Sequence, residues 1–119
     1  MKVAVTAKGK TLQDAVDPRF GRAAFIILVD IDSMAFEAID NSANINAFKG
    51  AGIHAASMIC ERGAEVLLTG YCGPNAYKTA NAGGVKVVND VSGTVEEAIA
   101  KFKEGEVQYS SAPNTEGHW

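Results

Sequence analysis

The stretch Thr69-Gly70-Tyr71-Cys72-Gly73-Pro74-Asn75-Ala76-Tyr77 follows an apolar run over residues 65–68 that is typical of a buried strand. Gly70 and Gly73 permit backbone conformations and close approaches that other residues do not. Pro74 suits the first turn of a helix, where its missing N–H costs nothing. The stretch therefore predicts a loop from the C-terminal end of a strand to a helix N-terminus, which is where open α/β sheets bind ligands. Free N–H groups and the positive end of a helix dipole favour an anion there.

Length and composition indicate one ordinary globular domain, with 119 residues, 47% hydrophobic and 21% charged. No apolar run approaches the ~20 residues of a membrane span, and the N-terminus enters a strand without a signal-peptide pattern. We therefore expect a cytoplasmic protein that does not interact with membranes. The net charge of −3 argues against a nucleic-acid partner.

Periodicity and turn residues predict five strands and three main helices. A capping box, Thr94-Val95-Glu96-Glu97, starts the helix that we expect over Val95 to Lys103. In it the Thr hydroxyl and the Glu carboxylate satisfy free N–H groups reciprocally. The expected strands are residues 2–7, 23–32, 35–40, 64–69 and 85–88, and the expected helices are residues 53–62, 74–82 and 95–103. Residues 41–49 are polar and are expected to form a loop.

This order predicts an α/β fold with a mixed sheet in three layers. Residues 23–40 form an antiparallel hairpin at one edge, whereas the later strands alternate with helices and are expected to be parallel. Residues 2–7 are expected to be the central strand. We expect a single domain over residues 1–105 and a flexible C-terminal tail over residues 106–119, in which His118 and Trp119 have no assigned role.

The connection over residues 8–22 is long for a compact domain, and loops of this length are usually functional or disordered. The spacing of Leu12, Val16 and Phe20 predicts that it packs onto the core at points. Residues 1–22 carry a charge of +3 and the remaining chain −6. A positive region on an acidic protein suits a small anion, although ordinary solvated surface charge is an equally good interpretation.

The sequence motifs of several enzyme classes are absent from this chain. The chain has no GxxxxGK[ST] loop, no GxGxxG after a strand, no GxSxG elbow and no HExxH. The two cysteines, Cys60 and Cys72, make neither a disulfide framework nor a CxxC site. Asp30 and Asp32 are most simply solvated residues near a turn, and they make a weak metal pair.

What remains is a predicted cleft with four walls: the loop with Arg19 and Arg22, the helix start at residues 50–54, the loop at residues 70–75, and the end of the last strand near Asn89. Donors outnumber acceptors, and no nucleophile has an evident base. This balance favours binding over catalysis.

Four motifs in this order resemble the dinitrogenase iron–molybdenum cofactor-binding family, and in particular its small stand-alone members. They are Arg19-Phe20-Gly21-Arg22-Ala23, Gly50-Ala51-Gly52-Ile53, Gly70-Tyr71-Cys72-Gly73-Pro74-Asn75-Ala76 and Gly93-Thr94-Val95-Glu96-Glu97-Ala98. Each motif is weak alone, whereas the four together are fairly specific, and the resemblance extends over roughly residues 1–105.

The resemblance implies a ribonuclease H-like fold and the non-catalytic, non-covalent carriage of an anionic metal–sulfur cluster. The implied cofactor is a molybdenum-containing cluster of the Mo–Cu sulfide or Fe–Mo type. Carried over by position, the contact candidates are Arg19, Arg22, His54, Gly70, Tyr71, Gly73, Asn75 and Lys78. His54 could equally be a capping or surface residue.

Cys72 departs from the pattern expected of the family. We expect it to be accessible in its loop, where a thiolate could ligate copper or iron, or the residue could be incidental. Two other functions stay open. One is a protein-interaction module without a cluster, in a cytoplasmic complex with P-loop ATPases. The other is a ribonuclease H-type hydrolase, which rests on the fold alone and lacks a convincing carboxylate set.

Overall fold

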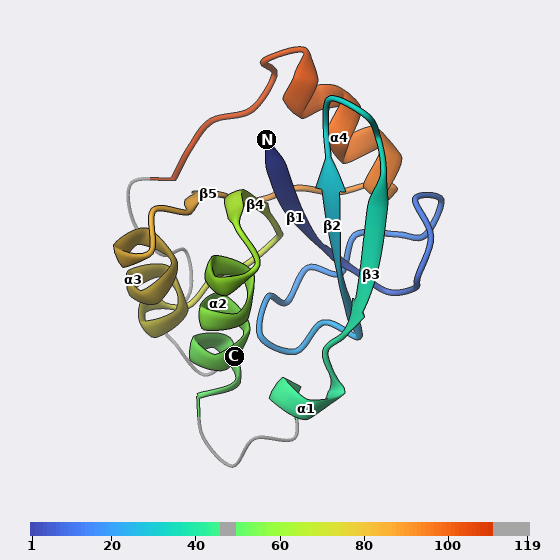
Figure 1. The fold of residues 1–119 in the computed structure, drawn as a ribbon. Helices are drawn as coiled ribbons and strands as arrows, with labels where there is room; N and C mark the ends of the chain where they lie inside the picture. The colour runs from blue at the N-terminus through green and yellow to red at the C-terminus, as the bar shows by residue number, and fades with distance from the viewer. Residues whose placement is uncertain (46–49, 111–119) are drawn as a thin grey trace.

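The computed structural model describes residues 1–45 and 50–110 and contains a mixed five-stranded sheet between two layers of helices (Figure 1). The strands are β1 (Lys2–Ala7), β2 (Phe25–Asp30), β3 (Phe36–Asp40), β4 (Ala64–Leu68) and β5 (Lys86–Val88). The helices are α1 (Ser42–Ile45), α2 (Ala51–Glu61), α3 (Pro74–Ala82) and α4 (Val95–Lys103). The predicted fold class is confirmed.

The sheet has the order β3-β2-β1-β4-β5, with β1 at its centre as predicted. β1 pairs antiparallel with β2 and parallel with β4, and β2 and β3 form the expected hairpin. β4 and β5 are parallel. The carboxyl ends of β1, β4 and β5 therefore lie at one edge of the sheet, and the loops that leave them meet there.

Alternating side chains of β1 divide the core into two halves, because successive residues of a strand point to opposite faces. Ala4 belongs to the cluster that contains Ala55 and Ile59 of α2. Val3 and Val5 belong to the cluster that contains Val95 and Ile99 of α4. α2 and α3 therefore cover one face of the sheet and α4 the other.

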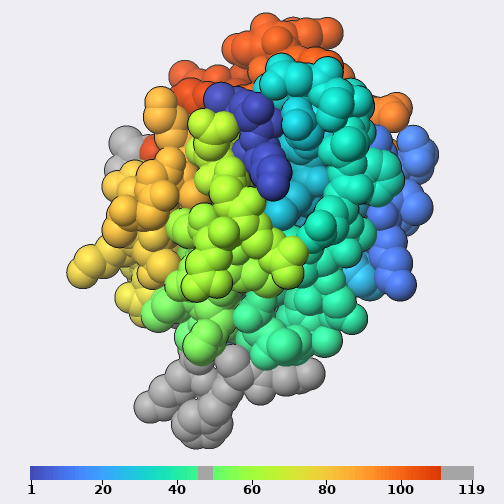
Figure 2. All heavy atoms as spheres, in the orientation of Figure 1, coloured from blue at the N-terminus to red at the C-terminus, as the bar shows by residue number. Residues whose placement is uncertain are grey.

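The turns at the amino end of β1 are joined by polar contacts. The Met1 ammonium group lies 3.2 Å from Asp32 Oδ2, and Lys2 Nζ donates to the carbonyl of Arg62 at 3.5 Å. In Figure 2 the start of the chain, in dark blue, accordingly lies at the surface between the residues that follow α2 and the β2–β3 turn.

Several predicted boundaries are correct, and others shift by one or two residues. α3 and α4 begin and end where expected, and the Thr94 capping box is present. α2 begins at Ala51 rather than residue 53, because Gly50 takes a left-handed conformation (φ 75°) and serves as its N-cap.

The loop expected over residues 41–49 begins instead with the short helix α1. Its start is fixed by Asn41, whose carbonyl accepts from the N–H groups of Asn44 and Ile45. Residues 46–49 lie outside the described residues.

The long connection over residues 8–22 packs onto the body, as the apolar spacing predicted. Val16 and Phe20 are buried, and Leu12 packs against the core. Backbone hydrogen bonds join Asp17 N to the Thr6 carbonyl and Val16 N to the Gly93 carbonyl. The connection is thus a fixed wall at the carboxyl edge of the sheet.

Residues 106–110, the first part of the predicted tail, run back beside β5. The N–H of Ser110 donates to the Val87 carbonyl at 2.7 Å, and Tyr77 Oη donates to the Ser110 carbonyl at 2.9 Å. Residues 111–119, with His118 and Trp119, lie outside the described residues. The domain boundary at residue 105 stays a prediction.

Candidate functional site

The arginine loop (residues 17–22) and the glycine loop (residues 70–73) are joined by backbone hydrogen bonds. Tyr71 N donates to the Pro18 carbonyl at 2.6 Å, and Phe20 N donates to the Tyr71 carbonyl at 3.2 Å. Arg19 and Tyr71 thus form an isolated parallel bridge. Two segments separated by about fifty residues in sequence are held in one register at the carboxyl edge of the sheet.

Two glycines allow the backbones to come this close. A Cβ atom on Gly70 would lie 2.7 Å from Pro18 Cα, and one on Gly21 would lie 2.5 Å from Gly52 N at the start of α2. Neither glycine has a positive φ, so the requirement is for space rather than for conformation. The arginine loop is therefore packed between the glycine loop and the first turn of α2.

The fourth predicted wall also reaches this edge. Asp90 N donates to the Gly70 carbonyl and Val91 N to the Thr69 carbonyl, both at 3.0 Å. Asn89 Nδ2 donates to Ser110 Oγ at 2.7 Å, whereas Asn89 Oδ1 is buried without a hydrogen-bond partner in the described part of the chain. The structure therefore places all four walls in one region.

The starts of α2 and α3 differ from the start of α4. Gly50 and Gly73 are their N-caps, so neither helix has a side-chain cap, and neither has an acidic residue in its first turn. α4 has both a capping Thr94 and the acidic Glu96 and Glu97. Because a helix N-terminus has unpaired N–H groups and a partial positive charge, the two glycine-capped helices suit an external anion, whereas α4 supplies its own.

The predicted contact side chains are exposed around these elements. The side chain of Arg19 is 48% exposed, and Tyr71 is 40% exposed as a whole residue. Arg22 follows on the same loop, His54 lies in the first turn of α2, and the α3 residues Asn75 and Lys78 are also exposed. A backbone bridge joins Arg19 to Tyr71, whereas Lys78 lies one turn along α3 from its start at this edge.

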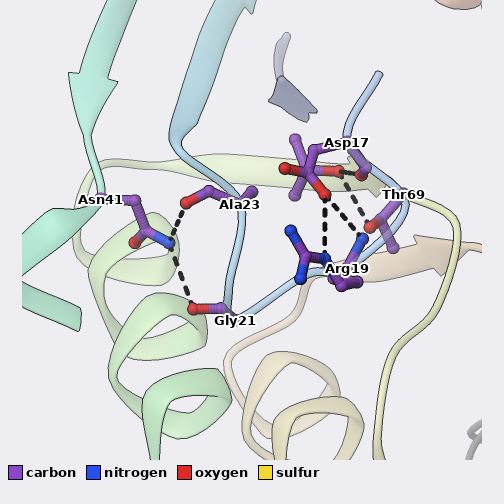
Figure 3. A network of polar contacts seen from close by, with 7 residues as sticks. Asp17, Arg19, Gly21, Ala23, Asn41 and Thr69 are labelled. Atoms are coloured by element: carbon purple, nitrogen blue, oxygen red, sulfur yellow. Dashed lines mark hydrogen bonds and ion pairs between the residues drawn. The ribbon is translucent and has the colours of Figure 1, made fainter. Parts of the chain in front are cut away.

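A buried polar network under the arginine loop was missed by the sequence analysis (Figure 3). Asp17 is 3% exposed, and its Oδ1 accepts from Arg19 N at 3.1 Å and lies 3.7 Å from Arg19 Nε. Thr6 Oγ1 donates to the Asp17 carbonyl at 2.6 Å and lies 3.0 Å from Thr69 Oγ1. The one available signal was the Asp17-Pro18 pair, which favours turn initiation.

Asn41 fixes the far end of the same loop. Its Nδ2 donates to the carbonyls of Gly21 (3.3 Å) and Ala23 (2.8 Å), and the residue is fully buried (Figure 3). The local sequence predicts no contact for Asn41, because nothing in it marks an asparagine whose hydrogen-bond partners lie about twenty residues earlier.

The expectation that Cys72 is accessible was wrong. Cys72 is fully buried in the core beside α2 and α3, and burial raises the pKa of its thiol to about 12. The reason is that the glycine loop turns inward after Tyr71, so the side chain fills the core instead of facing solvent. In this conformation Cys72 is a protonated thiol and a poor metal ligand, and the ligation of a metal by Cys72 stays a prediction.

Other features bear on the remaining functions. A hollow of about 590 Å³ lies between the end of β5, α4 and residues 106–110. Within residues 1–45 and 50–110, no three His, Cys, Asp or Glu side chains converge as a metal site would require. In the same ranges, no helix is long and apolar enough to cross a membrane.

The fold and this edge define a small α/β protein with basic and glycine-rich loops at the carboxyl ends of its parallel strands. Residues 1–105 match the model of the dinitrogenase iron-molybdenum cofactor family, and the chain belongs to that family.

Solved structures agree with this assignment. The apo form of the orange protein from Desulfovibrio gigas is 46% identical, with 96% of each chain covered and a TM-score of 0.93. A NifB-like protein from Thermotoga is 35% identical, with 98% of each chain covered and a TM-score of 0.83. In sequence, the chain is also similar to an uncharacterized protein of Methanocaldococcus jannaschii, which is 29% identical over 91% of this chain and 90% of its own. The predicted likeness to small stand-alone members is confirmed.

We expect Gly21→Ala to destabilise the protein by about 1–3 kcal/mol, because the added methyl group overlaps the backbone of Gly52. Urea unfolding measures the loss. Gly9→Ala is the matched control on the same connection, where the nearest atoms to the methyl group are those of the Asp14 carboxylate, a side-chain end rather than backbone, which can turn away at the cost of its bonds to Thr11. Equal losses in the two variants would contradict the close approach at Gly21.

We expect Cys72 to resist thiol reagents in the native protein at pH 8, because a pKa of about 12 leaves about one thiol in ten thousand ionised. The Cys60→Ser variant isolates Cys72, and labelling with a chromogenic disulfide should become complete only in denaturant. The Cys72→Ser variant reports Cys60, which is partly exposed, as the reference. Native-state labelling of Cys72 as fast as that of Cys60 would show that the loop opens.

Proposed function

We propose that this protein binds and carries an anionic metal–sulfur cluster at the carboxyl edge of its sheet, without catalysing a reaction. The observation that carries the proposal is the meeting of the arginine loop with the N-termini of α2 and α3, which have glycine N-caps and no side-chain cap. Family membership supports the same cargo class. The finer proposal is a molybdenum-containing cluster, either a Mo–Cu sulfide or an Fe–Mo type.

The donors at this edge fit such a cargo. A metal–sulfide cluster is a bulky, polarisable anion that accepts several weak hydrogen bonds over a wide surface. Arg19 and Arg22 supply N–H forks, and the helix starts at residues 50–54 and 73–75 supply backbone N–H groups. We infer that Tyr71 contributes its exposed ring and that His54, Asn75 and Lys78 contribute polar contacts. None of these contacts requires a thiolate.

A second candidate function is a protein-interaction module in a cytoplasmic complex with P-loop ATPases. The observation that favours it is the edge strand β3, whose outer side pairs with no strand in residues 1–45 and 50–110 and where Phe36 is 45% exposed beside a hollow of about 290 Å³. An unpaired edge can accept a strand from a partner. A pull-down with metal-free protein separates the two functions: a stoichiometric ATPase partner, with no metal retained, favours the module.

The cargo proposal predicts that apo-protein titrated anaerobically with tetrathiomolybdate, with and without copper(I), retains coloured metal after desalting. We expect Arg19→Ala with Arg22→Ala to weaken binding by about tenfold or more, because two charge-assisted contacts are lost. Visible absorption and metal analysis measure retention, and urea unfolding shows that the domain still folds.

Lys101→Ala with Lys103→Ala is the control, since it changes the net charge equally at the end of α4, where the last turn is basic. Retention that is the same in both double variants and in the wild type would refute the proposed site. Metal that washes off the wild type under every condition would refute the cargo.

A further inference from the structure

The arginine loop contains a buried acid directly under its first arginine. The carboxylate of Asp17 is 5% exposed, whereas the side chain of Arg19 above it is 48% exposed. Nε of the guanidinium lies 3.7 Å from Asp17 Oδ1. Among the described residues, Asp17 is the one acid that forms an ion pair with Arg19. One cation therefore faces a fixed internal anion on one side and the proposed cargo site on the other.

The backbone of Asp17 is fixed by hydrogen bonds to the central strand β1. Its N–H donates to the Thr6 carbonyl at 2.9 Å, and its own carbonyl accepts from Thr6 Oγ1 at 2.6 Å. Thr6 Oγ1 is in turn 3.0 Å from Thr69 Oγ1, at the end of the neighbouring strand β4 (Figure 3). The negative charge is thus tied to the central strand and stays under the site.

We propose that Asp17 limits the affinity of the site, because its fixed carboxylate competes with the anionic cargo for Arg19 and keeps binding reversible. This inference rests on the proposed function. A like charge close to a bound anion lowers the affinity, and partial burial weakens the screening by solvent and salt. A carrier that must release its cargo gains from such an opposing charge, since most changes in affinity appear in the dissociation rate.

The geometry separates this effect from a purely structural one. Asp17 Oδ1 also accepts from Arg19 N at 3.1 Å and so shapes the turn. Asparagine retains an oxygen at that position and loses the charge. Asp17→Asn therefore removes the competition and keeps the turn.

The experiment is an anaerobic titration of apo-protein with tetrathiomolybdate, followed by a chase that gives the dissociation rate. Asp17→Asn should bind about threefold to tenfold more tightly than the wild type, mainly through slower dissociation. In the Arg19→Ala background the gain should shrink, because the cation for which the two anions compete is absent.

Asp14→Asn is the matched control: it makes the same change in net charge, but Asp14 is bonded to Thr11 N and Oγ1 in another turn. Asp17→Ser, whose hydroxyl can also accept from Arg19 N, replaces the asparagine variant if urea unfolding shows that it does not fold. An affinity equal to that of Asp14→Asn, or weaker than that of the wild type, would overturn the inference alone. Failure of the wild type to retain tetrathiomolybdate would overturn the proposed function and this inference together.

Discussion

The structure of the site depends on the contact between the backbones of the arginine loop and the glycine loop. Tyr71 N bonds the Pro18 carbonyl, and Phe20 N bonds the Tyr71 carbonyl. These bonds require the two loop backbones to approach more closely than a side chain at Gly70 would allow. Because Thr6 and Thr69 link the strands from which both loops leave, the loops are fixed to the central sheet. The exposed side chains of the proposed site thus rest on a rigid base, although they lie on loops.

The charge at this edge of the sheet depends on acidic residues that are missing from helix starts as well as on charged residues that are present. α4 has its own cap and acidic first turn, whereas α2 and α3 begin with glycine caps and no acid. The two helices that start beside the arginine loop therefore have neither a side-chain cap nor an acidic residue at their first N–H groups. Asp17 is an acid at the same edge, and it is buried beside Arg19. The proposed site thus combines groups that would attract an anion with one that would oppose it, which fits carriage better than permanent storage.

Local patterns predicted most of the fold because each was complete within a few residues. The capping box at Thr94 and the Pro74 start of α3 specify their helices without help from the rest of the chain. The two runs within residues 23–40 predicted the antiparallel hairpin. The helices that separate the later strands predicted that β4 and β5 are parallel. The start of α2 was missed by two residues, since it depends on the backbone conformation of Gly50. α1 depends on Asn41, whose side-chain partners lie about twenty residues earlier.

The sequence alone determined the order of the five strands and of the helices α2, α3 and α4, the glycine-rich turn after β4 and the cationic character of the first loop. These follow from residue types and their spacing. Only the tertiary structure decided that the loops touch, that Asp17 lies under Arg19 and that Cys72 faces the core. The physical reason is that burial and pairing across long stretches of chain are settled by which strands become neighbours. Local sequence does not record the direction in which a loop side chain points once two backbones have packed together.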